Sequence, residues 1–555
     1  MSSAAKTAIR IGLLGSVAAW HLCLIGMVEA FSRRALVGRE VTFGYALLVI
    51  LAVAIGNLAG RRVSETRQAI AAGAGAGLIV GVALALLSAI ISSFSLRTMF
   101  VSATPRLVEI LTPEAAGGPL LPILAGAICG ALGALLSYIP LVWRRVLVYA
   151  PLTTVLIGLM REVLVPLMPR DIARFFFTNS GLQVAGALII LVLTGAVVWA
   201  GATFQPARRA AGQPGARYTP WQVAQFGIAA LLLLTFPLWS SLFLSNVVSF
   251  IGLYIIMGLG LNLVVGFAGL LDLGYVGFFA IGAYTMAVLT SPDLQLFQLS
   301  FWQALPFALL VALFAGVLLG LPVLRMRGDY LAITTLGFGE IIRLLALSDW
   351  LKPYLGGAQG VTRIARPTIG DFVFDTPQEF YYLILIGCLI AWVMAKRIKD
   401  SRLGRAWMAI REDEDVAQAM GINRVTAKLT AFALGALLGG LSGSIFAAMV
   451  NSVVPTSFGL LISINVVALI IIGGLGSLPG VLIGALVLVG LPELLREFND
   501  YRLLVYGALL VVMMLFRPQG LWPEEAIERE LAEAPALAEE QTAPLPAVPT
   551  SNTEV

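Results

Sequence analysis

Apolar runs of about 20 residues recur along most of this 555-residue chain. A helix of that length crosses the roughly 30 Å hydrocarbon core of a bilayer, whereas a barrel strand has about ten residues of alternating polarity. Backbone groups in lipid must find their hydrogen bonds within the chain, so long unbroken apolar runs favour helices. With 59% hydrophobic and 12% charged residues, the composition argues against a soluble globular protein. The sequence therefore predicts an all-α, polytopic helical membrane protein.

Residues 1–203 predict an amino-terminal membrane extension of five or six spans. The small residues Val28 and Ala30 fit a signal-peptide cleavage pattern, but the long apolar run and the spans behind it favour a retained first helix. The candidate spans of this extension are 9–31, 42–59, 69–93, 118–140, 146–167 and 183–203.

A stretch rich in Pro, Gly and Arg, FQPARRAAGQPGARYTPW at 204–221, predicts a cytoplasmic linker. Residues 222–517 then predict a membrane core of ten spans, and residues 518–555 a disordered acidic cytoplasmic tail, because that tail has six prolines and eight acidic residues against one basic residue. The spans of the core are 222–243, 246–266, 275–290, 303–325, 329–349, 379–395, 428–451, 460–475, 479–496 and 502–517.

Loop charge supports this arrangement of the core. If the linker is cytoplasmic, the inside loops carry fourteen basic residues and the outside loops carry five. Basic residues are enriched in cytoplasmic loops, so the ten-span order agrees with the positive-inside rule.

The glycines in the apolar runs form ladders at four-residue spacing. Gly435, Gly439 and Gly443 make one ladder, and Gly126 and Gly130 make a shorter one. Small residues let helices in a membrane approach closely, so we expect packing within the bundle, with self-dimerisation as the alternative.

Several kinds of chemistry lack their residues in this sequence. With His21 as the one histidine, neither a histidine-based zinc site nor a Ser-His-Asp arrangement has enough parts. Cys23, Cys129 and Cys388 lie singly in apolar segments and are expected to be packing thiols. The phosphate-binding pattern GxxxxGK[ST] needs Gly-Lys, and none of the five lysines follows a glycine. The net charge of +5 fits contact with membrane lipid and cytoplasmic loops better than a nucleic-acid partner.

One short polar stretch, EDEDVAQAMG at 412–421, separates two long apolar ones. Four acidic residues in succession favour a helix amino terminus, and Gly421 favours a left-handed turn at the other end. Val416 and Met420 are four residues apart and Ala417 lies beside them, which predicts a small apolar face that a partner's groove could accept. A solvated connector helix is the alternative.

Four longer stretches resemble, in order, the LivM-type permease subunit of branched-chain amino-acid ATP-binding-cassette importers. The resemblance covers roughly residues 222–520, whereas the 221 residues before the core exceed the usual extension of that family. These stretches are GLGLNLVVGFAGLLDLGYVGFFAIGAYTMAVL (258–289), RGDYLAITTLGFGEIIRLL (327–345), REDEDVAQAMGINRVTAKLTAFALGALLGGLSG (411–443) and GGLGSLPGVLIGALVL (473–488).

The resemblance implies a heterodimer with a sister permease of the LivH type, two cytoplasmic ATP-binding subunits and an external substrate-binding protein. ATP and Mg would be bound by those partners and no cofactor by this chain, which would lie in the bacterial cytoplasmic (inner) membrane. The extension is then expected to be a scaffold against the sister subunit, or alternatively a second functional domain. The residues that the resemblance implies as the ATPase-coupling helix are Glu412, Asp413, Ala417, Met420, Gly421 and Ile422.

Polar groups at membrane depth are candidates for the substrate path because they are costly in lipid without a partner. Glu340 and Arg343 are one helical turn apart and could neutralise each other. Asn262 precedes GFAGLLDLGY, which contains Asp272, and Asn465 precedes GGLGSLPG; both glycine-rich stretches allow an interrupted helix, and they resemble a repeat. For each of these residues a purely structural role is the alternative.

Rival functions stay open at this point. A related urea or amide permease is the nearest substrate alternative. An ion-coupled secondary transporter would use buried acids such as Glu340 and Asp272 as ion sites and would need no ATPase. A non-transporting membrane scaffold is the third reading, suggested by the long extension alone.

Overall fold

The computed structural model is almost entirely helical, in agreement with the predicted class, and forms two compact units. One unit comprises residues 1–233 and 494–501, and the other comprises 234–493 and 502–555. The structure describes residues 3–523 except 39, 40, 64, 95, 96, 98, 101, 114–116, 166, 167, 169, 179, 180, 210–230, 232, 239, 324, 325, 327, 495–503, 505, 506, 509, 512, 514, 516 and 518.

Among the described residues, ten helices are long and apolar enough to cross a membrane, and four shorter apolar helices accompany them. The small strands pair two by two: β1 with β2, β3 with β6 and β4 with β5. The strands are β1 (Ala35–Val37), β2 (Val41–Thr42), β3 (Val361–Thr362), β4 (Thr368–Ile369), β5 (Phe372–Val373) and β6 (Ser452–Val453).

The amino-terminal unit follows the predicted spans with three differences, at Gly26, at Met160 and at Arg209. The predicted span 146–167 is divided at Met160, because one helix covers Leu141–Leu159 and a separate short helix covers Arg161–Leu164. Gly26 has φ = 85° and divides the first span into two helices, and the last helix runs to Arg209, so residues 204–209 of the predicted linker are helical. Residues 210–221 of that linker lie outside the described part. The helices are α1 (Ser3–Leu24), α2 (Met27–Ser32), α3 (Phe43–Gly60), α4 (Thr66–Ser93), α5 (Pro105–Leu111), α6 (Leu120–Leu135), α7 (Leu141–Leu159), α8 (Arg161–Leu164), α9 (Arg170–Phe176) and α10 (Val184–Arg209).

In the second unit, six of the ten predicted core spans consist entirely of described residues, while 222–243, 303–325, 479–496 and 502–517 lie partly outside them. Its helices are α12 (Leu242–Leu261), the π-helix η4 (Asn262–Phe267), α13 (Val276–Thr290), α14 (Phe301–Val323), α15 (Asp329–Leu347), α16 (Lys352–Leu355), the 3-10 helix η5 (Gly357–Gln359), α17 (Pro377–Lys399), α18 (Arg402–Glu412), α19 (Glu414–Ala419), α20 (Arg424–Val450), the 3-10 helix η6 (Pro455–Phe458), α21 (Leu460–Gly473), α22 (Leu478–Ala485), the π-helix η7 (Leu486–Gly490) and α23 (Leu491–Leu494).

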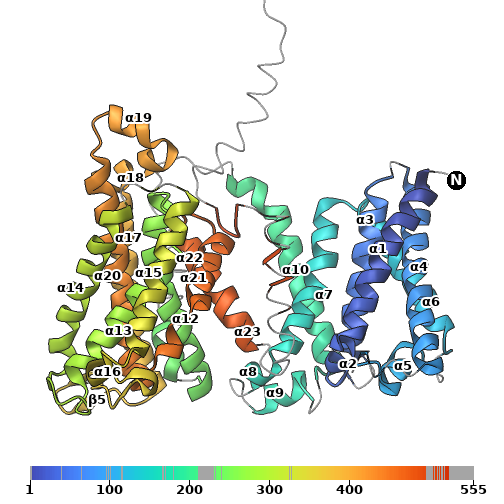
Figure 1. Ribbon diagram of the computed structural model, residues 1–555. Coiled ribbons are helices and arrows are strands. Elements are labelled where there is room, and N and C mark those ends of the chain that lie inside the picture. Colours follow the sequence, from blue (N-terminus) through green and yellow to red (C-terminus); the bar gives the residue numbers. More distant parts are fainter. Residues whose placement is uncertain are drawn as a thin grey trace, which may run out of the picture. The chain divides into compact units, whose positions relative to one another are not determined.

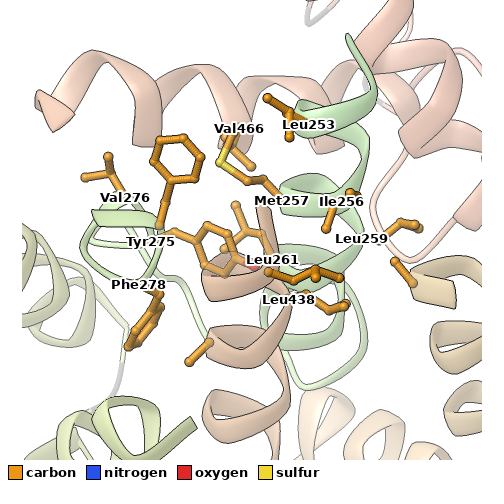
Figure 2. Packing of buried hydrophobic residues seen from close by; sticks show 14 of the residues in the cluster. Leu253, Ile256, Met257, Leu259, Leu261, Tyr275, Val276, Phe278, Leu438 and Val466 are labelled. Atoms are coloured by element: carbon orange, nitrogen blue, oxygen red, sulfur yellow. The ribbon is translucent and has the colours of Figure 1, made fainter. Parts of the chain in front are cut away.

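The core of this unit surrounds α20 and the start of α13. Figure 2 shows Met257 and Leu261 of α12 beside the ring of Tyr275, with Leu438 of α20 nearby. The Tyr275 hydroxyl donates to the Gly435 carbonyl oxygen at 2.8 Å. The Gly435 ladder therefore packs inside the bundle, as expected, and so does the Gly126 ladder of the other unit, which faces Gly77 of α4.

The loops of the second unit gather at two ends, as Figure 1 shows, with α18 and α19 at one end and α16 and β5 at the other. Loop residue Met326 lines a cavity together with Asp413 and Glu414. At the opposite end, Arg363 pairs with Asp293. The loop at Met326 thus lies at the same end of the unit as the stretch 396–428, which carries eight basic residues, in agreement with the loop-charge argument.

The predicted tail begins with ordered residues, which corrects that expectation for residues 519–523. The Leu521 amide donates to the Ile472 carbonyl oxygen at 2.7 Å, and the Trp522 amide donates to the Gly473 carbonyl oxygen at 3.0 Å. This short segment follows the end of α21 because backbone groups there have no partner within a helix. Residues 524–555 lie outside the described part.

Candidate functional site

The polar stretch between α17 and α20 folds into two helices in place of the one that the sequence predicts. Ser401 caps the amino terminus of α18, accepting hydrogen bonds from the amides of Leu403 and Gly404. Helix α18 ends at Glu412, so this residue closes the first helix and does not begin the second. The amphipathic pattern of α18 was missed because its apolar side chains are too few for a membrane span.

The carboxylate of Asp413 caps the second helix, α19. Its Oδ1 accepts the amide hydrogens of Asp415 and Val416, each at 2.9 Å. At the other end Gly421 has φ = 89°, and the Ile422 amide donates to the Ala417 carbonyl oxygen at 3.0 Å. The predicted helix start near the acidic residues and the left-handed turn at Gly421 are therefore confirmed.

The residues expected to form the ATPase-coupling helix differ in their solvent exposure. The side chains of Met420 and Val416 are 80% and 59% exposed, whereas Ala417 is 4% exposed. Glu412 and Asp413 are exposed, and Ile422 is half-buried against the core of the unit. The apolar face that the sequence predicts thus consists of Val416 and Met420, while Ala417 faces the chain's own core, which corrects the interpretation of that residue.

Two buried side chains fix this segment to α20. Lys428 is 2% exposed, and its Nζ lies 2.8 Å from Oε1 of Glu414. Trp407, which is fully buried, donates from its indole Nε1 to the Ala427 carbonyl oxygen at 2.8 Å. Because an unpaired charge is expensive to bury, the ion pair holds α19 in one position on α20. The sequence interpretation missed Lys428 because it treated this residue as loop charge at the start of a span.

The two glycine-rich stretches do interrupt helices, and Asn262 connects them. After Leu261 the chain continues as the π-helix η4 and then as a loop up to Tyr275. Between α21 and α22, Gly474 and Gly476 have φ values of 119° and 81°. The buried Asn262 accepts the Gly476 amide hydrogen on Oδ1 at 3.0 Å. The two glycine-rich stretches, whose sequences resemble a repeat, are therefore also in direct contact.

Asp272 closes the turn at the end of the first interruption. This side chain is fully buried; its Oδ1 accepts from the Gly274 amide at 2.9 Å, and its Oδ2 has no hydrogen-bond partner among the described residues. The neighbouring Leu273 amide donates to Thr335 Oγ1 at 3.0 Å. Asp272 thus shapes the loop where it meets α15.

Glu340 and Arg343 lie further along α15 and pair with each other, as their spacing predicts. The Arg343 Nε lies 3.1 Å from Oε1 and 3.0 Å from Oε2 of Glu340. The Glu340 side chain is 41% exposed and that of Arg343 is 26% exposed. Asn465 has a different environment again, because it is a hydrogen-bond partner of the Tyr254 hydroxyl on α12.

No group of three or more His, Cys, Asp or Glu side chains in the described part of the chain could hold a metal ion. The arrangement is one of interrupted helices, buried polar ties and an exposed end segment. Such an arrangement suits movement of a solute.

Comparison with known proteins gives the family. The family model described as "Branched-chain amino acid transport system / permease component" matches residues 243–514. The LivM high-affinity branched-chain amino acid transport permease of Salmonella typhimurium is 41% identical over 311 residues, covering 52% of this chain and 72% of the relative, and LivM of Escherichia coli has the same values. LivH of Escherichia coli is 26% identical over 202 residues, covering 34% of this chain and 65% of the relative. No solved structure matches. The chain belongs to the family of branched-chain amino acid transport permease components, and it is a multi-pass membrane protein of the LivM type.

Proposed function

We propose that this chain is the transmembrane permease subunit of an ATP-binding-cassette importer that carries leucine, isoleucine and valine across the bacterial cytoplasmic membrane. The identity of 41% to two LivM permeases supports this substrate class. The partners are a sister permease of the LivH type, two ATP-binding subunits and an external substrate-binding protein. ATP and Mg²⁺ are bound by the ATP-binding subunits. The amino-terminal unit serves as a scaffold against the sister permease.

The observation that carries the proposal is the exposed apolar face of a firmly held helix. Val416 and Met420 protrude from α19, whose position is fixed by the buried pair of Glu414 and Lys428. A helix that presents apolar side chains fits a partner's groove. Closure of the ATP-binding subunits around such a projection moves α18 and α19 together with the start of α20, to which both are bonded. The surface that contacts the motor comprises Val416 and Met420 with Glu412, Asp413, Gly421 and Ile422.

The half-exposed pair of Glu340 and Arg343 supports a role for α15 in the solute route. Both residues lie well inside a 19-residue candidate span, and their side chains are not enclosed by the described part of this chain. Charged groups facing lipid are costly, so this face of α15 borders water or the sister permease. Asn262, Asp272 and Asn465 have local partners and shape the backbone beside the route.

Reconstitution tests the function. The chain, co-purified with its partners, is placed in proteoliposomes, and uptake of leucine is measured with and without ATP at the ATP-binding subunits. We expect ATP-dependent uptake that an ionophore leaves unchanged, competed by isoleucine and valine. Uptake by the chain alone, abolished by an ionophore and indifferent to ATP, would support an ion-coupled transporter, for which the buried Asp272 is the candidate site. Competition by urea or short amides, with none by valine, would point to an amide permease.

The docking surface has its own test with a matched control. Met420→Asp places a charge on the proposed motor contact, whereas Trp350→Asp changes a side chain that is 79% exposed at the opposite end of the unit. Co-purification of the ATP-binding subunits is expected to fall with Met420→Asp and to persist with Trp350→Asp. Equal co-purification of the subunits by both variants contradicts the assignment of α19.

A further inference from the structure

The last turn of α18 touches the first interrupted helix through Arg411. The Arg411 guanidinium donates from Nη1 to the Gly266 carbonyl oxygen at 2.6 Å. Gly266 lies in the π-helix η4, where the usual hydrogen-bond pattern of an α-helix is altered. A charged donor on such a carbonyl oxygen makes a stronger bond than a neutral donor does.

The backbone of the same loop is shaped to fit against the Arg411 side chain. Gly269 has φ = 69°, and a Cβ at this position would lie 3.1 Å from Cβ and 2.9 Å from Cγ of Arg411. A second cation reaches the same interruption, because Lys399 Nζ lies 5.7 Å from the centre of the Phe267 ring. The cytoplasmic ends of α17 and α18 therefore both hold the end of η4.

From η4 the contact continues to the second interruption. Asn262 begins η4 and bonds the Gly476 amide, so Gly266 and Gly476 are joined through one turn of π-helix and one side chain. Arg411 is also one residue from Glu412, which ends α18, and two from Asp413, which caps α19. A continuous series of bonded groups thus leads from the exposed helix α19 to both helix breaks.

A cavity beside the bond between Arg411 and Gly266 leaves space for loop residues 268–271 to change position. Arg411, Asp413 and Lys428 line this cavity of about 370 Å³, which also borders loop residues 268–271. Asp413 and Glu414 at the start of α19 line the cavity together with that loop, and the Arg411 side chain bonds to Gly266. A displacement of α18 and α19 therefore reaches η4 directly through this side chain, in addition to the packing of α20 against η4 at Gly435.

We propose that Arg411 is a positioning residue that ties the motor-docking segment to the interrupted helix η4, so that movement of α18 and α19 shifts η4 and, through Asn262, the break at Gly476. This inference rests on the proposed ATP-driven function. Arg411 contacts neither nucleotide nor solute; it acts by keeping two segments of backbone together throughout the transport cycle.

The first experiment compares two arginines of one helix. Arg411→Gln removes the charged donor, and Arg411→Lys keeps one. Arg405→Gln is the matched control, because Arg405 is exposed and bonds to a nearby backbone atom, the Asp400 carbonyl oxygen, at 3.0 Å. Leucine uptake and ATP hydrolysis are measured for each assembled transporter in proteoliposomes. Arg411→Gln is expected to lower the uptake per ATP by about tenfold. Arg411→Lys should recover part of this loss, and Arg405→Gln should leave the ratio unchanged.

A second experiment uses one protein in two redox states, so that folding is controlled. Gly269→Cys and Arg411→Cys are combined in a chain whose native cysteines are replaced by alanine. The two Cβ positions lie 3.1 Å apart, so a small outward shift of the loop brings them to the spacing of a disulfide. The reduced form should hydrolyse ATP with little uptake. The oxidised form should regain uptake per ATP, since the covalent bond replaces the arginine contact.

The outcomes distinguish a failure of the proposed transport function from a failure of the role assigned to Arg411. If the unmodified transporter shows no ATP-dependent uptake, the proposed function fails. If the unmodified transporter is coupled but Arg411→Gln is coupled equally well, only the role of Arg411 is overturned. The same role is overturned if the fully oxidised double-cysteine form stays uncoupled, or if Arg411→Gln lowers uptake and ATP hydrolysis in parallel through loss of assembled protein.

Discussion

The two units share close glycine packing but differ in how many buried side chains bond to the backbone of another helix. In the amino-terminal unit, Gly73 and Gly77 of α4 meet Gly126 and Gly130 of α6 so closely that backbone packs on backbone. In the second unit, many buried side chains bond to backbone atoms of other helices; for example, Ser442 Oγ donates to the Leu253 carbonyl oxygen at 3.0 Å.

The difference shows what each unit can tolerate. The Gly126 ladder lies on two regular helices, and its contacts repeat along both of them. Side-chain bonds to backbone satisfy groups that a broken helix leaves free, as at Asn262 and Gly476. The family match at residues 243–514 falls in the second unit except for residues 494–501. This contrast fits the proposed scaffold role of the first unit and the proposed change of shape in the second.

The largest expected effect is the loss of stability when the buried ion pair of Glu414 and Lys428 in the second unit is broken. Glu414→Ala leaves Lys428, 2% exposed, without its closest carboxylate, so the free energy of unfolding should fall by about 3–5 kcal/mol. Adding Lys428→Met removes the stranded charge and should restore most of that loss. The measurement is the thermal and denaturant unfolding of the purified protein in detergent.

The comparison of the single variant with the double variant decides whether the ion pair fixes α19 on α20. If the single variant and the double variant have equal stability, the ion pair does not fix α19 on α20. The contrast drawn between the two units would then lose its best-defined case.

The next largest effect concerns the backbone packing of the first unit. It compares the same substitution, glycine to alanine, at Gly77 and at Gly75. A Cβ on Gly77 would overlap the Gly126 carbonyl oxygen, whereas a Cβ on Gly75 of the same helix would lie 3.3 Å from the Ala8 Cβ. Gly77→Ala should therefore destabilise the protein by about 1–3 kcal/mol. Gly75→Ala should be close to neutral, because alanine favours the helix by up to about 1 kcal/mol.

Transport activity is the second measurement for Gly77→Ala and Gly75→Ala. If the first unit is a support, uptake per ATP by the folded fraction of Gly77→Ala should equal that of the unmodified protein. A change in that ratio without a loss of stability would mean that the first unit takes part in transport.

The sequence predicted the helical spans well because a single property, a long apolar run, defines each of them. It also located the α19 cap and the Gly421 turn, since both depend on local chemistry. It did not predict α18, in which only Gly404, Trp407 and Ile410 are buried.

Two features of the site were beyond the reach of sequence patterns. The bond between Asn262 and Gly476 joins residues that are 214 positions apart, and no local pattern indicates such a pairing. The orientation of α19 was also undetermined, because a helix of six residues is too short for its periodicity to show which of Val416, Ala417 and Met420 faces the core.

The smallest expected change in stability, at Gly421, is the sharpest test of how α19 works. Gly421 has φ = 89°, and no atom lies within 4 Å of the position that its Cβ would occupy. A substitution therefore acts through the backbone conformation and not through a clash. Gly421→Val should cost about 1–2 kcal/mol, because a β-branched residue disfavours the left-handed region. Gly421→Asn is the control, since asparagine adopts that region more readily.

Coupling is expected to respond more strongly than stability at this position. When the turn is forced out of the left-handed region, α19 meets the start of α20 at a different angle, and Met420 is presented differently to the ATP-binding subunits. ATP hydrolysis should then continue while leucine uptake falls for Gly421→Val, and both should stay near the unmodified level for Gly421→Asn. Coupled transport by the valine variant would mean that the angle of α19 is irrelevant, and the docking role assigned to this helix would have to be abandoned.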